Sequence, residues 1–169
     1  MPMKPCERVD LGFIENAPFR FVSTVDLPIT PEQLFEVFED AESWPNWASV
    51  ITEVTWTSAP PRGVGTTRTV KMRGGIVGAE EFLAWEPYSH MAFRFNEASS
   101  GSIAAFAEDY RVVRTPRGCH LTWVMAMKPR GLAARIGMTL GTPVMGWLFQ
   151  KFLFNLRDYA VKRFGVTAR

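Results

Sequence analysis

The sequence predicts an α+β domain in which a curved antiparallel sheet of seven strands wraps around a long C-terminal helix, with two short helices after the first strand. Six segments with period-two alternation follow one another and are joined by short turns that contain Gly, Pro or Ser. Short links favour antiparallel neighbours, because parallel strands need crossover connections. A long apolar stretch of helical period ends the chain and is the one element able to cover a sheet face. With 169 residues, the chain has the size of a single domain.

The first elements follow from local residue preferences. Residues 1–18 mix Pro, charge and isolated apolar residues without a period, and we interpret them as a leader before a domain at 19–169. The segment Phe19–Leu27 is β-branched and aromatic, which predicts a strand. Thr30 can then cap a helix that has Pro31 at its first position.

The rest of the chain is predicted to form one more short helical segment, then six strands and a long closing helix. A second short helical segment is expected at 41–47, where Pro45 interrupts it. Six strands are predicted, at 50–57, 66–73, 76–85, 91–96, 102–113 and 119–128. The closing helix is expected at 131–164, and Pro143 should kink or split it. A curved sheet wrapped around one helix leaves a pocket between the two.

Composition excludes several classes of protein. Hydrophobic residues make up 47% of the chain and charged residues 21%, which excludes a disordered or fibrous chain. Cys6 and Cys119 are too few for a disulfide framework, and no signal segment opens the chain, so we expect a soluble, cytoplasmic protein with reduced thiols. The uncharged stretch from Ile136 to Gln150 is too short, and too broken by Pro143, to span a bilayer.

Charge is distributed unevenly along the chain. Residues 1–109 contain 8 Lys and Arg against 16 Asp and Glu, whereas residues 110–169 contain 11 against 1. Either the two halves interleave in one fold, or one half faces an acidic partner or a membrane. Nucleic acid is not expected as a partner, because the net charge is only +2 and no binding module is visible.

Several motifs resemble the START-related polyketide cyclase/dehydratase and lipid-transport superfamily. They are Thr30-Pro31-Glu32-Gln33-Leu34-Phe35 followed by Asp40, Trp44-Pro45-Asn46-Trp47, Trp85-Glu86-Pro87, and Gly118 followed by Leu121-Thr122-Trp123. The order of elements agrees over roughly residues 19–164. The resemblance implies a helix-grip fold with a hydrophobic cavity. It does not fix the activity, because the superfamily includes carriers, quinone chaperones, cyclases and regulators.

Side-chain alternation assigns the expected cavity walls. Trp123 and Met125 share one face of their strand, and Phe93 and Phe95 share one face of theirs, so we expect both faces to point toward the long helix. The expected ligand-binding residues are Phe35, Phe38, Phe93, Phe95, Phe106, Trp123, Met125, Trp147 and Phe152. Most of these residues would be part of the hydrophobic core in any domain of this class. They show that an apolar pocket lining is possible, but not that a ligand is bound.

Glu108 is the first candidate for chemistry. It shares parity with Phe106 and Tyr110, so its carboxyl should face the cavity, where burial would raise its pKa. It would then act as a general acid or base beside Tyr110. The alternatives are a structural carboxyl paired with a tyrosine or arginine, and a solvated carboxyl at the open edge.

A second carboxyl is expected on the strand at 76–85. Either Glu80 or Glu81 must point inward unless a bulge intervenes. We favour Glu81, because Leu83 and Trp85 share its parity and form the bulkier apolar set.

Other kinds of catalytic site lack support. His90 is expected in a turn and His120 on the outer face, so no histidine is placed to activate a nucleophile such as Cys119. Histidine and cysteine are too few for a metal site, and Gly63-Val64-Gly65 lacks the context of a phosphate-binding loop, so no cofactor is expected.

The leading hypothesis is the binding, and by extension the transport, of a hydrophobic small molecule (a lipid, quinone or polyketide-like compound) in an internal cavity. The alternative is an enzyme of the polyketide cyclase/dehydratase type with Glu108 and Tyr110 as its acid–base pair. A regulatory or assembly protein is a third class. An all-apolar interior would favour carriage, and converging carboxyl, tyrosine and arginine groups would favour catalysis.

Lys128, Arg130 and Arg135 lie beside the apolar start of the last helix. They suggest a transient membrane-surface contact, or else they only keep this end of the helix soluble.

Overall fold

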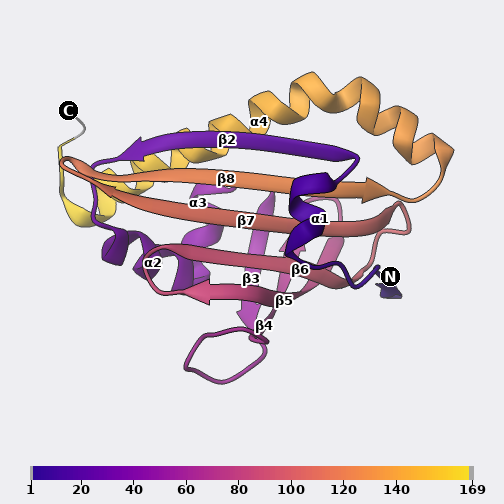
Figure 1. Ribbon diagram of the computed structural model, residues 1–169, viewed down its shortest axis with the longest axis horizontal. Helices are drawn as coiled ribbons and strands as arrows, with labels where there is room; N and C mark the ends of the chain where they lie inside the picture. Colours follow the sequence, from indigo (N-terminus) through magenta and orange to yellow (C-terminus); the bar gives the residue numbers. More distant parts are fainter. Residues whose placement is uncertain (1, 168–169) are drawn as a thin grey trace.

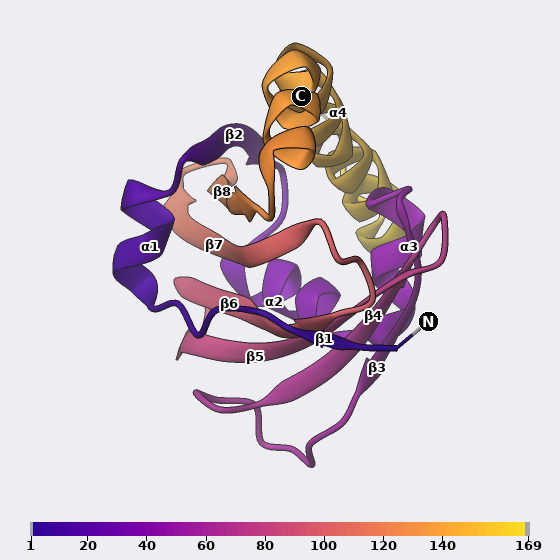
Figure 2. The same cartoon turned by 90° about the vertical axis from the view of Figure 1, so that its right-hand side faces the viewer.

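A computed structural model, which describes residues 2–167, shows the predicted meander of strands. The strands are β2 (Phe19–Leu27), β3 (Ile51–Trp56), β4 (Thr67–Met72), β5 (Ile76–Glu86), β6 (His90–Ala98), β7 (Ile103–Thr115) and β8 (Gly118–Pro129). They pair in the antiparallel order β2-β8-β7-β6-β5-β4-β3, so β2 and β3 form the two edges. The sheet curls, and helix α4 (Leu132–Phe164) packs against it (Figures 1 and 2). The expected α+β helix-grip arrangement is confirmed.

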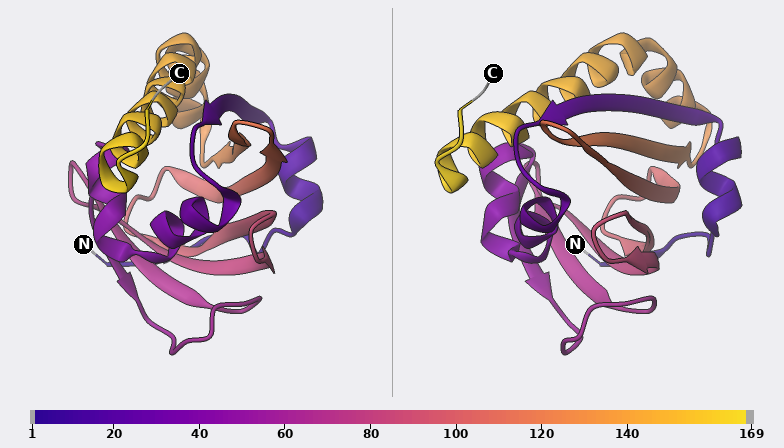
Figure 3. Two further views of the ribbon diagram at one scale, coloured as in Figure 1. Left: turned by 90° about the vertical axis from the view of Figure 1, so that its left-hand side faces the viewer. Right: turned by 60° about the vertical axis from the view of Figure 1, so that its left-hand side comes forward.

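The short helices after the first long strand begin where the sequence predicts. Helix α2 (Pro31–Glu39) has Thr30 as its N-cap, and the Thr30 hydroxyl accepts a 3.2 Å hydrogen bond from the Gln33 backbone N–H. The Gln33 side chain accepts a 2.9 Å bond from the Thr30 N–H in return, which completes a capping box. A single 3₁₀ turn (η1, Ala41–Ser43) and helix α3 (Trp44–Trp47) follow. Figure 3 shows α2 and α3 lying across one open end of the curled sheet.

Helix α4 is not split at Pro143, which was one of the two expected outcomes, because it continues through that residue as one helix. Proline removes one backbone donor and so frees the carbonyl of the residue four positions earlier, here Thr139. Thr139 is exposed, so water can bind that carbonyl and the helix need not split. The buried residues of α4 all lie in its second half, from Phe149 to Ala160.

The N-terminal segment at 4–16 packs on the sheet. Residues Lys4–Pro5 form a short strand (β1) that pairs with the end of β6, which adds an eighth strand beside the seven expected. Helix α1 (Leu11–Asn16) is capped by Asp10 and buries Ile14 against the outer face of the sheet. That face is lined there by small residues: Ala84, Ala92, Ala107, Val124 and Ala126. The N-terminal segment therefore covers the convex side of the same sheet whose concave side holds the main core.

A bulge in β5 overturns the inward choice of Glu81. The register shifts between Phe82 and Ala84, so Leu83 is an extra residue on its strand. Glu80 and Phe82 therefore point into the main core before the bulge, and Trp85 does so after it. Glu81 lies toward the outer side and bonds to Asn96 and Arg94. Strict alternation fails here because the bulge changes parity within one strand.

Within residues 2–167, no helix is long and apolar enough to cross a membrane.

Candidate functional site

Five polar side chains from four strands meet on the concave face of the sheet. Register places Arg68 of β4 opposite Glu80 of β5, and Tyr110 of β7 opposite Trp123 of β8. Glu108 precedes Tyr110 by two residues and therefore points to the same side. All five residues are buried, and we call them the buried polar cluster.

Glu108 is held by two hydrogen bonds to one oxygen. Its Oε2 accepts from the Tyr110 hydroxyl at 2.5 Å and from Trp123 Nε1 at 2.8 Å. Burial, together with the nearby charge of Glu80, raises the pKa of Glu108 to about 7, although the two hydrogen bonds and Arg68 oppose this rise. The carboxyl therefore exchanges its proton near neutral pH, where a general acid or base works best.

Tyr110 is the neutral member of this pair. Burial and the adjacent Glu108 carboxyl raise the pKa of Tyr110 well above its ordinary value. The phenol therefore stays protonated and serves as a donor. Its ring contacts four other aromatic rings. The centroid distances are 5.3 Å to Phe38, 5.8 Å to Trp123, 6.0 Å to Phe93 and 6.1 Å to Trp44.

Arg68 is a fully buried cation, with 1% of its surface exposed. Its Nε donates a hydrogen bond to Glu80, and its guanidinium carbon lies 4.3 Å from the ring centroid of Trp44 and 4.6 Å from that of Phe93. Aromatic faces attract a cation, and a buried charge needs a partner. Burial raises the pKa of Glu80, and the positive charge of Arg68 opposes that rise.

Two buried donors of this region make no hydrogen bond with any of residues 2–167. They are Nη1 of Arg68 and Nε1 of Trp47. Both border Trp44, whose ring centroid lies 4.8 Å from that of Trp47. Buried polar groups in folded proteins are nearly always paired, so two unpaired donors in one aromatic region mark a place where an acceptor oxygen would be stabilised.

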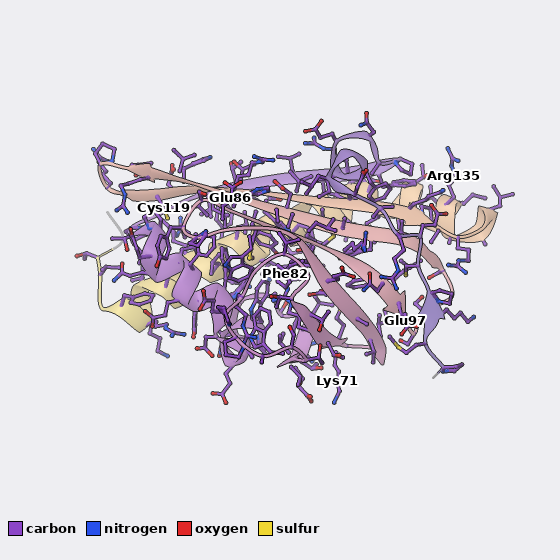
Figure 4. The ribbon with its side chains drawn as sticks, turned by 60° about the horizontal axis from the view of Figure 1, so that its bottom comes forward. Lys71, Phe82, Glu86, Glu97, Cys119 and Arg135 are labelled. Atoms are coloured by element: carbon purple, nitrogen blue, oxygen red, sulfur yellow. The ribbon has the colours of Figure 1, made fainter. Side chains whose placement is uncertain are left out.

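The structure brings together the two expected catalytic residues and eight of the nine expected ligand-binding residues. These eight are buried in one core: Phe35, Phe38, Phe93, Phe95, Phe106, Trp123, Met125 and Phe152. The rings pack closely, as in the stacked pair of Phe95 and Phe106 with centroids 4.2 Å apart. Figure 4 shows Phe82 within the packed interior of the molecule and Lys71 at its border.

Trp147 is the exception, because 62% of its surface is exposed. The sequence places apolar residues on more than one side of this helix, so the pattern alone does not fix which side faces the sheet. Phe149, two residues later, is buried and packs on Trp123 with ring centroids 5.5 Å apart. Residues two apart on a helix point to nearly opposite sides, which directs Trp147 away from the core.

Two hollows on the surface lie apart from the buried polar cluster. One of about 290 Å³ lies between the N-terminal segment and the turns at Gly75 and Ser100. The other, of about 220 Å³, lies along the first half of α4. The rings around the cluster pack against one another, as Tyr110 does on Phe38 and Trp123 with centroids 5.3 and 5.8 Å apart. A ligand that reaches the cluster must displace some of these rings.

The other face of β7 holds a second buried pair. His90 opens β6 rather than lying in a turn, and its Nε2 lies 2.5 Å from Asp109 Oδ1. Arg111 donates to the other Asp109 oxygen at 3.0 Å. Asp109 follows Glu108 directly, so this pair and the buried polar cluster are on opposite sides of the sheet. Within residues 2–167, no group of three His, Cys, Asp or Glu side chains could hold a metal ion.

Sequence reasoning missed Arg68 and the pair of His90 with Asp109, and it ranked Glu80 below Glu81 as the inward carboxyl. For Arg68 a signal was available, because it shares parity with Val70 on a strand whose other face carries Thr67, Thr69 and Lys71. Asp109 gave no such signal, since alternation places it on the outer face, where a charged residue is ordinary.

Comparison with known proteins identifies the family. Residues 18–161 match the model of the family described as polyketide cyclase / dehydrase and lipid transport. The chain belongs to this polyketide cyclase/dehydrase and lipid transport family. Uncharacterized proteins of Mycobacterium tuberculosis and Mycobacterium bovis are 59% identical to it over 165 residues, which cover 98% of both chains.

Solved structures share the fold of this member of the polyketide cyclase/dehydrase and lipid transport family. The Zhui aromatase/cyclase from Streptomyces sp. R1128 has a TM-score of 0.69 at 11% identity, over 88% of this chain and 99% of that one. The di-domain aromatase/cyclase StfQ of the steffimycin biosynthetic pathway has a TM-score of 0.69 at 10% identity, over 87% of this chain and 52% of that one. At such low identity the likeness establishes the fold alone.

Proposed function

We propose that this protein binds a largely apolar small molecule, such as a lipid, quinone or polyketide-like compound, between the concave face of the sheet and α4. The observation that carries the proposal is the pair of unpaired buried donors, Arg68 Nη1 and Trp47 Nε1, inside an aromatic core. An apolar body would pack on the rings, and an acceptor oxygen would bind these donors. Membership in a family of cyclases and lipid-transport proteins supports a ligand site of this kind.

Uptake of the ligand must open the packed interior. The second half of α4 covers Trp123 through Phe149, and Asn155 ties it to α3 by donating a 3.2 Å hydrogen bond to the Trp47 carbonyl. Both contacts lie next to the proposed site. We therefore expect ligand binding to change the exposure of the rings between α3, α4 and the sheet. Carriage of the ligand between sites would use the same opening.

The binding test uses the anionic fluorescent probe anilinonaphthalene sulfonate, which has an apolar body and acceptor oxygens. Replacing Arg68→Met together with Glu80→Gln removes the cation without leaving Glu80 unpaired. We expect this variant to bind the probe at least about tenfold more weakly, because the acceptor loses a charged donor. Lys71→Gln removes an exposed cation from the same strand and should leave affinity unchanged. Equal affinity in all three proteins would place the probe site elsewhere.

A second candidate is acid–base catalysis by Glu108, in an enzyme of the cyclase or dehydratase type. It is favoured by the convergence of a carboxyl with a pKa of about 7, a tyrosine donor and an arginine in one buried cluster. Both donated hydrogen bonds go to Oε2, so Oε1 is the oxygen that could exchange a proton with a bound molecule. The ionised carboxyl would take a proton from a carbon next to a carbonyl, and Arg68 would stabilise the enolate oxygen.

Glu108→Gln separates carriage from catalysis. For a catalyst, the variant should keep probe affinity at acid pH and slow turnover of a polyketide-like diketone by about 10²–10⁴-fold. For a carrier there is no turnover to slow, so at the site only ligand affinity can change. Probe titrations between pH 5 and 8 add a test that needs no substrate. If Glu108 contacts the ligand, affinity for the anionic probe falls as the carboxyl ionises in the wild type and stays level in the variant.

The cytoplasm is the compartment we propose. It is supported by Cys6 and Cys119, which are both buried free thiols.

A further inference from the structure

The first half of α4 carries an apolar stripe on its outer side. Its members, which we call the outer stripe, are Leu132, Ile136, Leu140, Val144 and Trp147. Their exposed fractions run from 51% to 77%. A helix that only closes a sheet is polar on the side that faces water, so this second apolar side needs another explanation. Figures 1 and 2 show this half of α4 standing beyond β2, at the border of the molecule.

Positive charge accompanies the outer stripe. Arg135 lines the same hollow as Leu132, Ile136 and Leu140, and the Lys151 ammonium lies 5.2 Å from the ring centroid of Trp147. The sequence contains no Asp or Glu between Asp109 and Asp158, so α4 has no acidic residue before its last two turns. Figure 4 shows Arg135 at one end of the molecule, far from Cys119.

We propose that the outer stripe docks on an anionic lipid surface. An apolar helix side bordered by Arg and Lys fits the boundary between acyl chains and acidic headgroups. Tryptophan side chains are enriched at that depth of a bilayer. The charges also argue against a second copy of the chain as the occupant. A symmetric contact through this stripe would bring Arg135 and Lys151 of both copies together with no nearby acid on the helix. The proposal is independent of the interior ligand.

Vesicle flotation tests the proposal. The wild type should float with vesicles of phosphatidylglycerol and phosphatidylcholine, and much less with phosphatidylcholine alone. Leu140→Glu should lower binding by at least about tenfold, because it places a carboxylate in the stripe. Val64→Glu is the matched control, since Val64 lies in the β3–β4 loop and is 72% exposed, against 77% for Leu140. This control should bind like the wild type.

Quenching by brominated lipid reports the depth of contact. Trp44, Trp47 and Trp123 are buried, and Trp56 and Trp85 are half-buried against the main core. The exposed Trp147 should therefore account for most of the quenching. Trp147→Phe keeps an apolar ring in the stripe and should abolish most of that quenching while flotation persists. Quenching that survives this change would mean that another face enters the lipid, which would overturn the assignment to α4.

Two further results would also overturn the proposal. One is a wild-type protein that does not float with the anionic vesicles, or that floats equally with the Leu140→Glu and Val64→Glu changes. The other is a wild-type dimer in sedimentation analysis that Leu140→Glu converts to a monomer. That outcome would assign the stripe to self-association.

Discussion

Glu108 and Tyr110 lie two residues apart on β7, and the Tyr110 hydroxyl donates a 2.5 Å hydrogen bond to the Glu108 carboxylate. An uninterrupted strand guarantees that such neighbours share a face, so one element sets the geometry of the pair. Trp123 on the adjacent strand donates a second hydrogen bond, from its Nε1, to the same Glu108 oxygen. The carboxyl is therefore positioned by backbone pairing between β7 and β8.

The raised pKa of Glu108 predicts a pH-dependent stability. The folded protein holds this proton up to a pKa of about 7, whereas an ordinary glutamate releases it near 4.5. Between these values the folded state binds more protons, so the free energy of unfolding falls as pH rises, by about 3 kcal/mol at pH 8. Glu108→Gln should remove this fall. Urea unfolding of both proteins at pH 5, 6.5 and 8 measures it, and parallel pH profiles would contradict the assignment.

Trp123 should contribute both packing and a hydrogen bond. Trp123→Ala removes a buried ring that stacks on Tyr110, and we expect a loss of about 3–5 kcal/mol in unfolding free energy. Trp123→Phe keeps an aromatic ring and removes the Nε1 donor, so the pKa of Glu108 should rise further above 7. Denaturant melts at several pH values report both effects. A loss under about 1 kcal/mol for the alanine variant would show that this position is not core.

The ion pair of Arg68 and Glu80 should behave as a coupled unit. Arg68→Met alone leaves a buried carboxylate without its cation and should destabilise the fold by about 3–5 kcal/mol. Adding Glu80→Gln should recover most of that loss, because no buried charge is then left unpaired. A double-mutant cycle in urea gives the coupling energy. Additive losses would mean that the two side chains do not interact in solution.

Gly118 should tolerate no side chain. Its φ is +145°, and a Cβ there would lie 2.1 Å from the backbone oxygen of Leu27 on β2. Gly118→Ala should therefore destabilise the fold by about 2–4 kcal/mol, since a backbone atom cannot turn away as a side chain can. Gly63→Ala is the control, because no atom lies within 4 Å of its Cβ position. Equal melting temperatures for the two variants would contradict the close approach.

Sequence reasoning succeeded where periodicity was unbroken. The strands β7 and β8 pair in regular register over most of their length, so parity placed Glu108, Tyr110 and Trp123 on the correct face. It failed in β5, because the bulge at Leu83 reverses parity and a bulge leaves no clear trace in residue type.

Helix α4 and the N-terminal segment show two other limits. Trp147 was misplaced because α4 is apolar on two sides, and periodicity cannot say which side meets the sheet. The elements β1 and α1 are two and six residues long, too short for any period to emerge. The unpaired donors of Arg68 and Trp47 depend on tertiary contacts, which residue types alone do not encode.

The small residues under α1 have a consequence for the boundaries of this fold. The match to the family begins at residue 18, after α1 has ended at Asn16. A shortened protein that starts there would keep every strand of the meander. It would expose the alanine residues that α1 covers on the outer face of the sheet, which are Ala84, Ala92, Ala107 and Ala126. We expect it to self-associate in light scattering, whereas the full chain would not do so through this face. The family match would then begin at a later residue than the shortest form of the protein that does not self-associate.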